Sequence, residues 1–347
     1  MIRSGSPHTR KIFRRLGLVL AGAVALAACG GGAADTDTSS GGDGSVGSAT
    51  LRLVAAWPEN DPYQNVGLGM LQEEVDKLSD GKMSIEVVGG PESIAPFDLA
   101  DAVRSGAIDM AWLSAAYYLP ALPEASVLDY SQLTAEEERE SGAFEYLSDI
   151  HHERMNAHLL GRGSVGSTYS MYTTKPVAAV ADLAGMRLRV SPVYVPFVEA
   201  LGAEAVTLPP GEIFTSLERG VINGFTWPFV GISAIQLHEV ARYQVLPTYW
   251  QTDIVELVNL DIWEGLSEAQ QEVLTQAAIN VEGRTGEAYE QLRAEELKTL
   301  EAAGVKQVEF EGGEAEKYLE LSRDSAKSWV QKNVRTDADT LIDKFFT

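Results

Sequence analysis

The segment from Gly185 to Pro228 sets the organisation of the chain. It contains three motifs: Gly185-Met186-Arg187-Leu188-Arg189-Val190, Leu208-Pro209-Pro210-Gly211-Glu212-Ile213-Phe214 and Arg219-Gly220-Val221-Ile222-Asn223-Gly224-Phe225-Thr226-Trp227-Pro228. Their pattern predicts strand, helix, strand, helix and strand. In the first of these strands, Arg187 and Arg189 are two residues apart and therefore face the same side.

Arg189 is the first candidate binding residue. A guanidinium beside apolar neighbours needs an acceptor, because this group is rarely buried without a partner. Its planar fork of N–H donors suits a carboxylate, such as that of a small organic acid. An ion pair with Glu199 or Glu212 would satisfy it equally well, and the spacing alone does not choose between the two hypotheses.

The first third of the chain predicts a βαβαβ unit, with strands over 50–57, 83–88 and 108–113 and helices over 63–78 and 97–104. This order favours a mainly parallel sheet with helical crossovers. Ligands of such sheets bind beyond the carboxyl ends of the strands. The candidate residues at those ends are Trp57, Trp112, Ser114, Tyr117 and Tyr118.

The last third of the chain predicts a long helix. Ser267-Glu268-Ala269-Gln270 is a capping box, and the amphipathic pattern after it continues to about Ala303, where Gly304 ends it. At about 1.5 Å per residue, this helix exceeds 50 Å. It is long enough to lie across two lobes, each with its own βαβ unit. A charged helix is also expected over 135–153.

Two features of the sequence are not expected to form a cofactor or metal site. Gly161-Arg162-Gly163-Ser164-Val165-Gly166 matches a dinucleotide fingerprint, but the β-branched and aromatic run over 168–174 predicts no helix to receive a pyrophosphate. His151 and His152 lie in the charged helix and are expected to be solvated. No histidine has the spacing of a zinc ligand, so the sequence predicts no metal and no cofactor.

Composition and the amino terminus indicate an exported protein. The formal charge is −23, which argues against nucleic acid as a partner. Residues 1–28 are basic up to Arg15 and then apolar, as in a signal peptide. Leu26-Ala27-Ala28-Cys29 resembles a lipobox, which implies that Cys29 is lipidated. Residues 29–48 are rich in Gly, Ser, Thr, Asp and Ala and predict a flexible tether.

The motifs quoted above resemble those of the solute-binding proteins of tripartite ATP-independent periplasmic (TRAP) transporters, the DctP-like family. Their order and spacing carry the resemblance, which covers the chain from Leu51 to about Phe346. It implies that Arg189 is the arginine that binds the substrate carboxylate. It also implies that Trp227 contacts the ligand, whereas Arg187 stands where relatives commonly have Lys and is expected to be solvated.

The same resemblance limits the chemical class of the expected ligand. Tyr169 and Ser114 stand where sialic-acid-binding relatives have an arginine and an acid. A Tyr169 hydroxyl that bonds the ligand carboxylate would favour a monocarboxylate. The Trp227 ring would favour an acid with an apolar or aromatic body. Relatives that bind α-keto acids hold a cation with carboxylates where this chain has Thr226 and Gln251, so no cation is expected. Weaker candidates for the site are Tyr117, Tyr194, Trp250, Trp57 and Trp112.

We therefore expect an α/β, two-lobed fold of the periplasmic-binding-protein type II, whose βαβ lobes are joined by hinge strands and the long helix. Lobe I is predicted to be 49–166 and 255–295, and lobe II 167–254 and 296–347. The expected function is capture of an organic acid for transporter membrane subunits, by a protein anchored to the membrane in the periplasm or at the cell surface. The alternatives are a sensor component and an exported hydrolase. The chain has no Gly-x-Ser-x-Gly elbow and no cysteine besides Cys29 to support the hydrolase.

Overall fold

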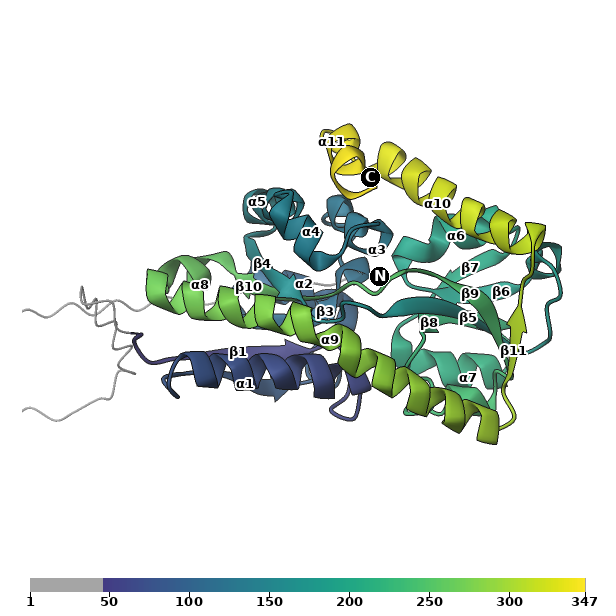
Figure 1. Ribbon diagram of the computed structural model, residues 1–347, viewed down its shortest axis with the longest axis horizontal. Coiled ribbons are helices and arrows are strands. Elements are labelled where there is room, and N and C mark those ends of the chain that lie inside the picture. Colours follow the sequence, from purple (N-terminus) through teal and green to yellow (C-terminus); the bar gives the residue numbers. More distant parts are fainter. Residues whose placement is uncertain (1–45, 347) are drawn as a thin grey trace, which may run out of the picture. The chain divides into compact units, whose positions relative to one another are not determined.

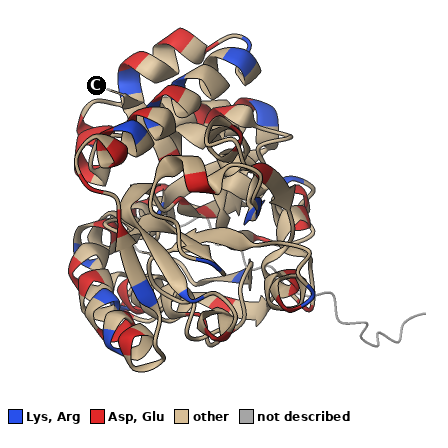
Figure 2. Cartoon of the chain, turned by 90° about the vertical axis from the view of Figure 1, so that its right-hand side faces the viewer, with Lys and Arg blue, Asp and Glu red and all other residues tan. Residues whose placement is uncertain are grey.

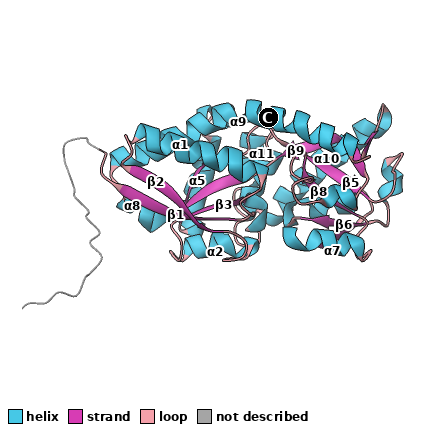
Figure 3. Ribbon diagram, turned by 90° about the horizontal axis from the view of Figure 1, so that it is seen from below, coloured by secondary structure: helices cyan, strands magenta, loops and turns pink. Residues whose placement is uncertain are grey.

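The computed structural model describes residues 46–346, in which the strands form two sheets joined by crossing segments (Figures 1 and 3). The predicted signal peptide, Cys29 and most of the predicted tether lie outside the described residues. Each sheet has helices packed against it. The expected α/β architecture with two lobes is confirmed.

The first sheet contains the amino-terminal βαβαβ unit. Its strand order is β2 (Met83–Gly89), β1 (Ala49–Ala55), β3 (Met110–Ser114), β10 (Ile254–Asn259) and β4 (Ala157–Arg162). β1 runs parallel to β2 and β3, whereas β10 is antiparallel to β3 and β4. The sheet is therefore mixed and not mainly parallel, because β10 enters it from the opposite direction.

The second sheet contains the strand that carries Arg189. Its order is β11 (Lys306–Glu309), β9 (Tyr243–Gln251), β5 (Thr168–Thr173), β8 (Gly224–Pro228), β6 (Arg187–Val190) and β7 (Glu204–Thr207). β6 is parallel to β7 and β8, as its place in the predicted alternation of strands and helices requires. β5 is antiparallel to β8 and β9.

The helices cover the sheets. They are α1 (Gly69–Leu78), α2 (Leu99–Arg104), α3 (Val127–Tyr130), α4 (Ala135–Glu140), α5 (Ala143–Met155), α6 (Val195–Ala200), α7 (Ile213–Glu218), α8 (Leu260–Gly265), α9 (Glu268–Ala302), α10 (Gly313–Asn333) and α11 (Ala338–Phe345). α4 and α5 replace the single helix expected over 135–153. Gly142, with φ of 70°, separates them.

The long helix α9 confirms the prediction made from its capping box. Both hydrogen bonds of the box form, between Ser267 and Gln270. The first part of α9 packs against α1 and β4. Near its other end, Glu296 accepts a 2.9 Å hydrogen bond from the backbone of Ser233, and Arg293 lies over the ring of Phe229. One rigid helix thus contacts both halves of the fold (Figure 1).

The chain also crosses between the sheets over 163–167 and at Thr252 and Asp253. At the second crossing, β9 of one sheet leads almost directly into β10 of the other. The carboxy-terminal helix α11 returns to pack against α3 and α5. These crossings bring the carboxyl ends of β1, β3, β6 and β8 toward a common region.

The excess of acidic over basic residues in the sequence is carried by the surface. In the view of Figure 2, Asp and Glu residues are spread over the helices, with Lys and Arg among them. Between residues 46 and 346, no helix combines the length and the hydropathy that a membrane span requires.

One buried carboxyl group gives a prediction for stability. Glu256 on β10 is 1% exposed, and no described residue donates a hydrogen bond to either of its oxygens. Burial, with the negative charge of Glu282 nearby, raises the pKa of Glu256 to about 8 from its usual 4.5. The folded state therefore keeps a proton that the unfolded chain releases above about pH 4.5.

The free energy of unfolding should thus fall as the pH rises from 5 to 8, by up to about 1.4 kcal/mol per pH unit from this group. Glu256→Gln should lose that contribution to the slope. Urea denaturation at several pH values measures it, with the exposed Glu264→Gln as the control. An equal slope in Glu256→Gln and the parent protein would refute the assignment.

Candidate functional site

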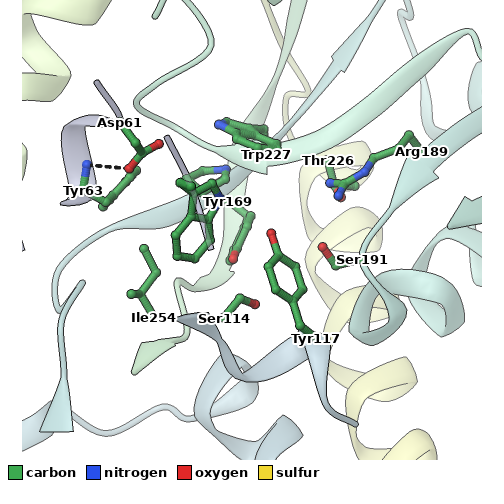
Figure 4. A pocket seen from close by; sticks show the side chains of 12 residues that line it. Asp61, Tyr63, Ser114, Tyr117, Tyr169, Arg189, Ser191, Thr226, Trp227 and Ile254 are labelled. Carbon is green, nitrogen blue, oxygen red and sulfur yellow. Dashed lines mark hydrogen bonds between the residues drawn. The ribbon is translucent and has the colours of Figure 1, made fainter. Parts of the chain in front are cut away.

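A narrow cavity lies where the carboxyl ends of strands from both sheets meet (Figure 4). The loop after β1, the end of β3 with its following turn and the start of β10 line one side. β5, β6 with the residue after it, and β8 line the other. The lining residues are Trp57, Asp61, Tyr63, Ser114, Tyr117, Tyr169, Arg189, Ser191, Thr226, Trp227, Pro228 and Ile254.

Arg189 is 1% exposed and lines this cavity. Its Nε donates a 2.9 Å hydrogen bond to the carbonyl oxygen of Leu208, which fixes the plane of the guanidinium. Its Nη2 finds no acceptor among the described residues. The guanidinium carbon lies 5.6 Å from the centroid of the Trp227 ring. Burial lowers the pKa of Arg189, although arginine remains protonated in proteins.

The alternative hypothesis for Arg189 was an ion pair with Glu199 or Glu212. Both glutamates are exposed, and neither lies within 4.0 Å of the guanidinium. Among residues 46–346, no Asp or Glu forms an ion pair with Arg189. The ion-pair hypothesis is therefore wrong, and the structure leaves a buried positive charge in the cavity wall without an acidic partner.

Ser114 and Tyr169 also line the cavity, but their hydroxyl groups are already engaged. Asp253 is fully buried between them. It accepts hydrogen bonds from Ser114 Oγ at 2.8 and 2.9 Å, and from the Tyr169 hydroxyl at 3.0 Å. The backbone N–H of Ala116 donates to the same carboxylate. The expectation that Tyr169 donates to a ligand carboxylate is not met in this arrangement, because its proton points to Asp253.

Four of the sequence-predicted residues, Trp112, Tyr118, Tyr194 and Trp250, do not line the cavity. Tyr118 is buried, and its hydroxyl is bonded to His151. Trp112 is fully buried in the first sheet, against Gly163. Tyr194 stacks on Trp250 with ring centroids 5.5 Å apart, and its hydroxyl donates to Asp129 at 2.9 Å. These side chains stabilise the packing behind the site. The structure brings the other six candidates together: Trp57, Ser114, Tyr117, Tyr169, Arg189 and Trp227.

Sequence reasoning missed half of the lining, including Asp61, Tyr63, Ser191 and Ile254. A usable signal existed for Asp61, because it lies in the turn after the first strand, at the end where ligands bind. Asp61 is 4% exposed, and burial raises its pKa to about 6.

Two other expectations concern metal ligands and histidines. Gln251 donates from Nε2 to the carbonyl oxygens of Ser131 and Leu133, both at 2.9 Å, and does not line the cavity. No group of three or more potential metal ligands occurs among the described His, Cys, Asp and Glu residues. His151 is fully buried and not solvated, because Tyr118 and the carbonyl of Leu147 bond its ring nitrogens.

Two sheets with helical layers, crossing segments and a cavity at their facing strand ends define a two-lobed solute-binding protein. The family model DctP, described as bacterial extracellular solute-binding protein, family 7, matches residues 53–333, and the chain belongs to this family. This is the family of TRAP solute-binding proteins, which bind small molecules and work with membrane transporter subunits. The relatives found are binding proteins and not enzymes.

Relatives and solved structures agree with this membership. The chain is 25% identical to a monocarboxylate 2-oxoacid-binding periplasmic protein of Nostoc, over 75% of this chain and 73% of that one. It is 28% identical to a solute-binding protein of Roseobacter denitrificans, over 79% and 84%. Its fold matches a TRAP periplasmic solute-binding protein from Desulfovibrio salexigens with bound orotic acid. That match has a TM-score of 0.77 and 22% identity, and covers 85% of this chain and 96% of the other.

Proposed function

We propose that this protein captures a small organic acid for TRAP-type secondary transport, and that Arg189 binds the acid's carboxylate in the cavity. The observation that carries the proposal is a guanidinium 1% exposed, with a free Nη2, no acidic partner among the described residues and a place in the cavity wall. A buried charge without a partner is costly. An anionic ligand would supply the missing partner.

The chemistry of the site fits a carboxylate. A guanidinium held at Nε by Leu208 can offer its remaining N–H groups to two oxygens at once. The ligands named for the relatives are also acids, since 2-oxoacids and orotic acid carry carboxylates. Because these relatives are no more than 28% identical to this chain, their ligands support the class of ligand and not one compound.

The division of the chain gives a mechanism for capture. We take 49–166 with 255–295 as lobe I and 167–254 with 296–347 as lobe II. Trp57 and Tyr117 would then approach the ligand from lobe I, and Arg189 and Trp227 from lobe II. An acid that contacts both lobes favours the closed state over the open one by the free energy of the added contacts.

For delivery to a membrane transporter, the protein would be held at the membrane by its amino terminus. The lipobox-like sequence before Cys29 supports export, cleavage and lipid anchoring at that cysteine. Cells that express the full chain should therefore hold it in the membrane fraction, and Cys29→Ser should move it to the soluble extracytoplasmic fraction. Equal membrane association of the two forms would contradict the anchor.

A thermal-shift screen of mono- and dicarboxylic acids tests the proposed function. Acids that bind should raise the melting temperature of the parent protein, whereas Arg189→Met should show no such shift. The screen should include 2-oxoacids, sugar acids, and cyclic and aromatic acids. If no acid raises the melting temperature, or if Arg189→Met keeps the full shift, the proposal fails.

Two tyrosines in the cavity wall are expected to contribute differently to acid binding. The Tyr117 hydroxyl points into the cavity near Arg189, and it is positioned to donate to the same carboxylate. Tyr117→Phe should weaken acid binding about tenfold, the effect of one hydrogen bond to a charged group. Tyr169→Phe should change the affinity less than about threefold, because the lost hydrogen bond goes to Asp253. Calorimetric titration of both variants checks this, and equal losses of affinity would contradict it.

A further inference from the structure

The cavity has a second buried charge that the proposed function does not use. Asp61 lines the cavity and is 4% exposed. Its Oδ1 accepts hydrogen bonds from the backbone N–H groups of Tyr63 and Gln64, at 3.0 and 3.1 Å. No described residue donates to its Oδ2, and no described Lys, Arg or His forms an ion pair with it. Figure 4 shows this oxygen on the side that faces Trp227.

The two charges lie at different ends of one aromatic wall. Arg189 is near the ring of Trp227 on one side. The indole Nε1 of Trp227 lies at the other end, beside Gly231 and Pro62: a Cβ built on Gly231 would be 3.5 Å from that nitrogen and 3.6 Å from the Pro62 ring. Pro62 directly follows Asp61 in the chain. The Trp227 side chain therefore lies between the positive and the negative end of the cavity.

A simple anion complements only half of this arrangement. It would satisfy Arg189 but leave the Asp61 carboxylate without a cationic partner, with no donor to Oδ2 among the described residues, and repelling the ligand. The cost of a buried unpaired charge is removed only if a cation or an N–H donor reaches Asp61. Burial raises the pKa of Asp61 to about 6, against the opposing effect of the hydrogen bonds from Gln64 and Tyr63, so its carboxyl group is mainly ionised at pH 7.5. The rings of Trp57, Tyr117 and Trp227 can also stabilise a cation between the two ends.

We propose that the ligand is a dipolar acid, whose carboxylate binds Arg189 and whose distal protonated amine or amidine donates to Asp61 across the face of Trp227. This inference rests on the proposed function and specifies its ligand. It replaces the apolar or aromatic monocarboxylate that the sequence favoured, because Asp61 gives the cavity a negative end. Amino acids with the two charges separated by three or more carbons fit this description better than α-amino acids.

Asp61 also has a structural role that the test must separate from ligand binding. Its Oδ1 accepts hydrogen bonds from Tyr63 and Gln64 in the first turn of the helical segment that begins at Pro62, and loss of such a cap destabilises a helix. Asparagine caps helices as well as aspartate does, and it has nearly the same shape. Asp61→Asn thus removes the charge and keeps the cap. The exposed Glu59, in the same turn but outside the cavity, provides the control Glu59→Gln.

Calorimetric titrations at pH 7.5 with pairs of isosteric probes test the proposal. One pair is isonipecotate and cyclohexanecarboxylate, and the other is 4-aminobutyrate and pentanoate. Within each pair the carboxylate and the size are kept, and only the distal ammonium is lost. The parent protein and Glu59→Gln should bind at least one amino acid ten or more times as tightly as its carbon isostere. In Asp61→Asn that ratio should fall below about three, with little change in melting temperature.

Each other outcome overturns the inference. A parent protein that binds the carbon isosteres as tightly as the amino acids has no cationic subsite. An Asp61→Asn variant that keeps the tenfold ratio shows that Asp61 does not supply it. If the acid screen finds ligands but neither amino acid binds, the dipolar class is wrong while the proposed function stands. Failure of the proposed function looks different, since Arg189→Met would then bind the same acids as the parent.

Discussion

Arg189→Met is expected to abolish acid binding and, at the same time, to stabilise the ligand-free protein. In the complex, the variant lacks the partner of a desolvated carboxylate, a loss worth about 2–5 kcal/mol, so the affinity should fall about 100-fold or more. Without ligand, the variant no longer buries a cation that has no acidic partner among the described residues. Methionine fills a similar volume with flexible apolar atoms.

The two effects are measured by calorimetric titration with an acid from the screen and by urea denaturation without ligand. We expect the free energy of unfolding to rise by about 1–3 kcal/mol, as when buried charges are replaced by apolar residues. Arg187→Met on the same strand is the matched control. Its guanidinium donates to the carbonyl oxygen of Gly220 and does not line the cavity, so its affinity should stay within about twofold. An Arg189→Met variant that binds within threefold of the parent would contradict the site.

Arg162→Met should cause a large loss of stability. Arg162 ends β4 and is 1% exposed, and its Nη1 pairs with the fully buried Glu138 at 2.5 Å. Its Nη2 donates to the carbonyl oxygens of Leu128 and Thr252, at 2.8 and 3.3 Å. The substitution leaves a buried carboxylate without its cation. Removal of one partner of a buried ion pair costs about 3–5 kcal/mol.

Urea denaturation measures this loss, and an exposed ion pair provides the control. Arg52 and Asp109 are 3.0 Å apart, but the Arg52 side chain is 55% exposed, so Arg52→Met should cost less than about 1 kcal/mol. The double variant Arg162→Met, Glu138→Leu should recover much of the stability, because no unpaired charge remains. A loss below 1 kcal/mol in Arg162→Met alone would show that Glu138 does not depend on this arginine.

The fold and the main candidate binding residue could be predicted from the sequence because both follow from local patterns. Alternating strands and helices, with the capping box at Ser267, predicted both lobes and the extent of α9. The position of Arg189 in a short apolar strand predicted its burial. These features depend on neighbours a few residues away, so they can be read from one chain.

The remainder of the site depends on contacts between distant segments. Tyr169 donates to Asp253, 84 residues later, and nothing in the spacing reveals that bond. Tyr194 and Trp250 resemble cavity residues in composition, but they pack against each other across the second sheet. Asp61 follows the first strand, but its place beside Trp227 in the cavity wall depends on the second sheet and cannot be read from its neighbours in the chain.

Arg189 is proposed to bind the ligand through the negative charge of its carboxylate. The most direct measurement is a calorimetric titration of the parent protein, at pH 7.5, with the tightest acid from the screen and with its primary amide. The amide keeps the size and the carbonyl oxygen but has no negative charge. We expect the acid to bind at least 100 times as tightly as the amide. Equal affinities for the two compounds would contradict the claim, whatever the fold and the family.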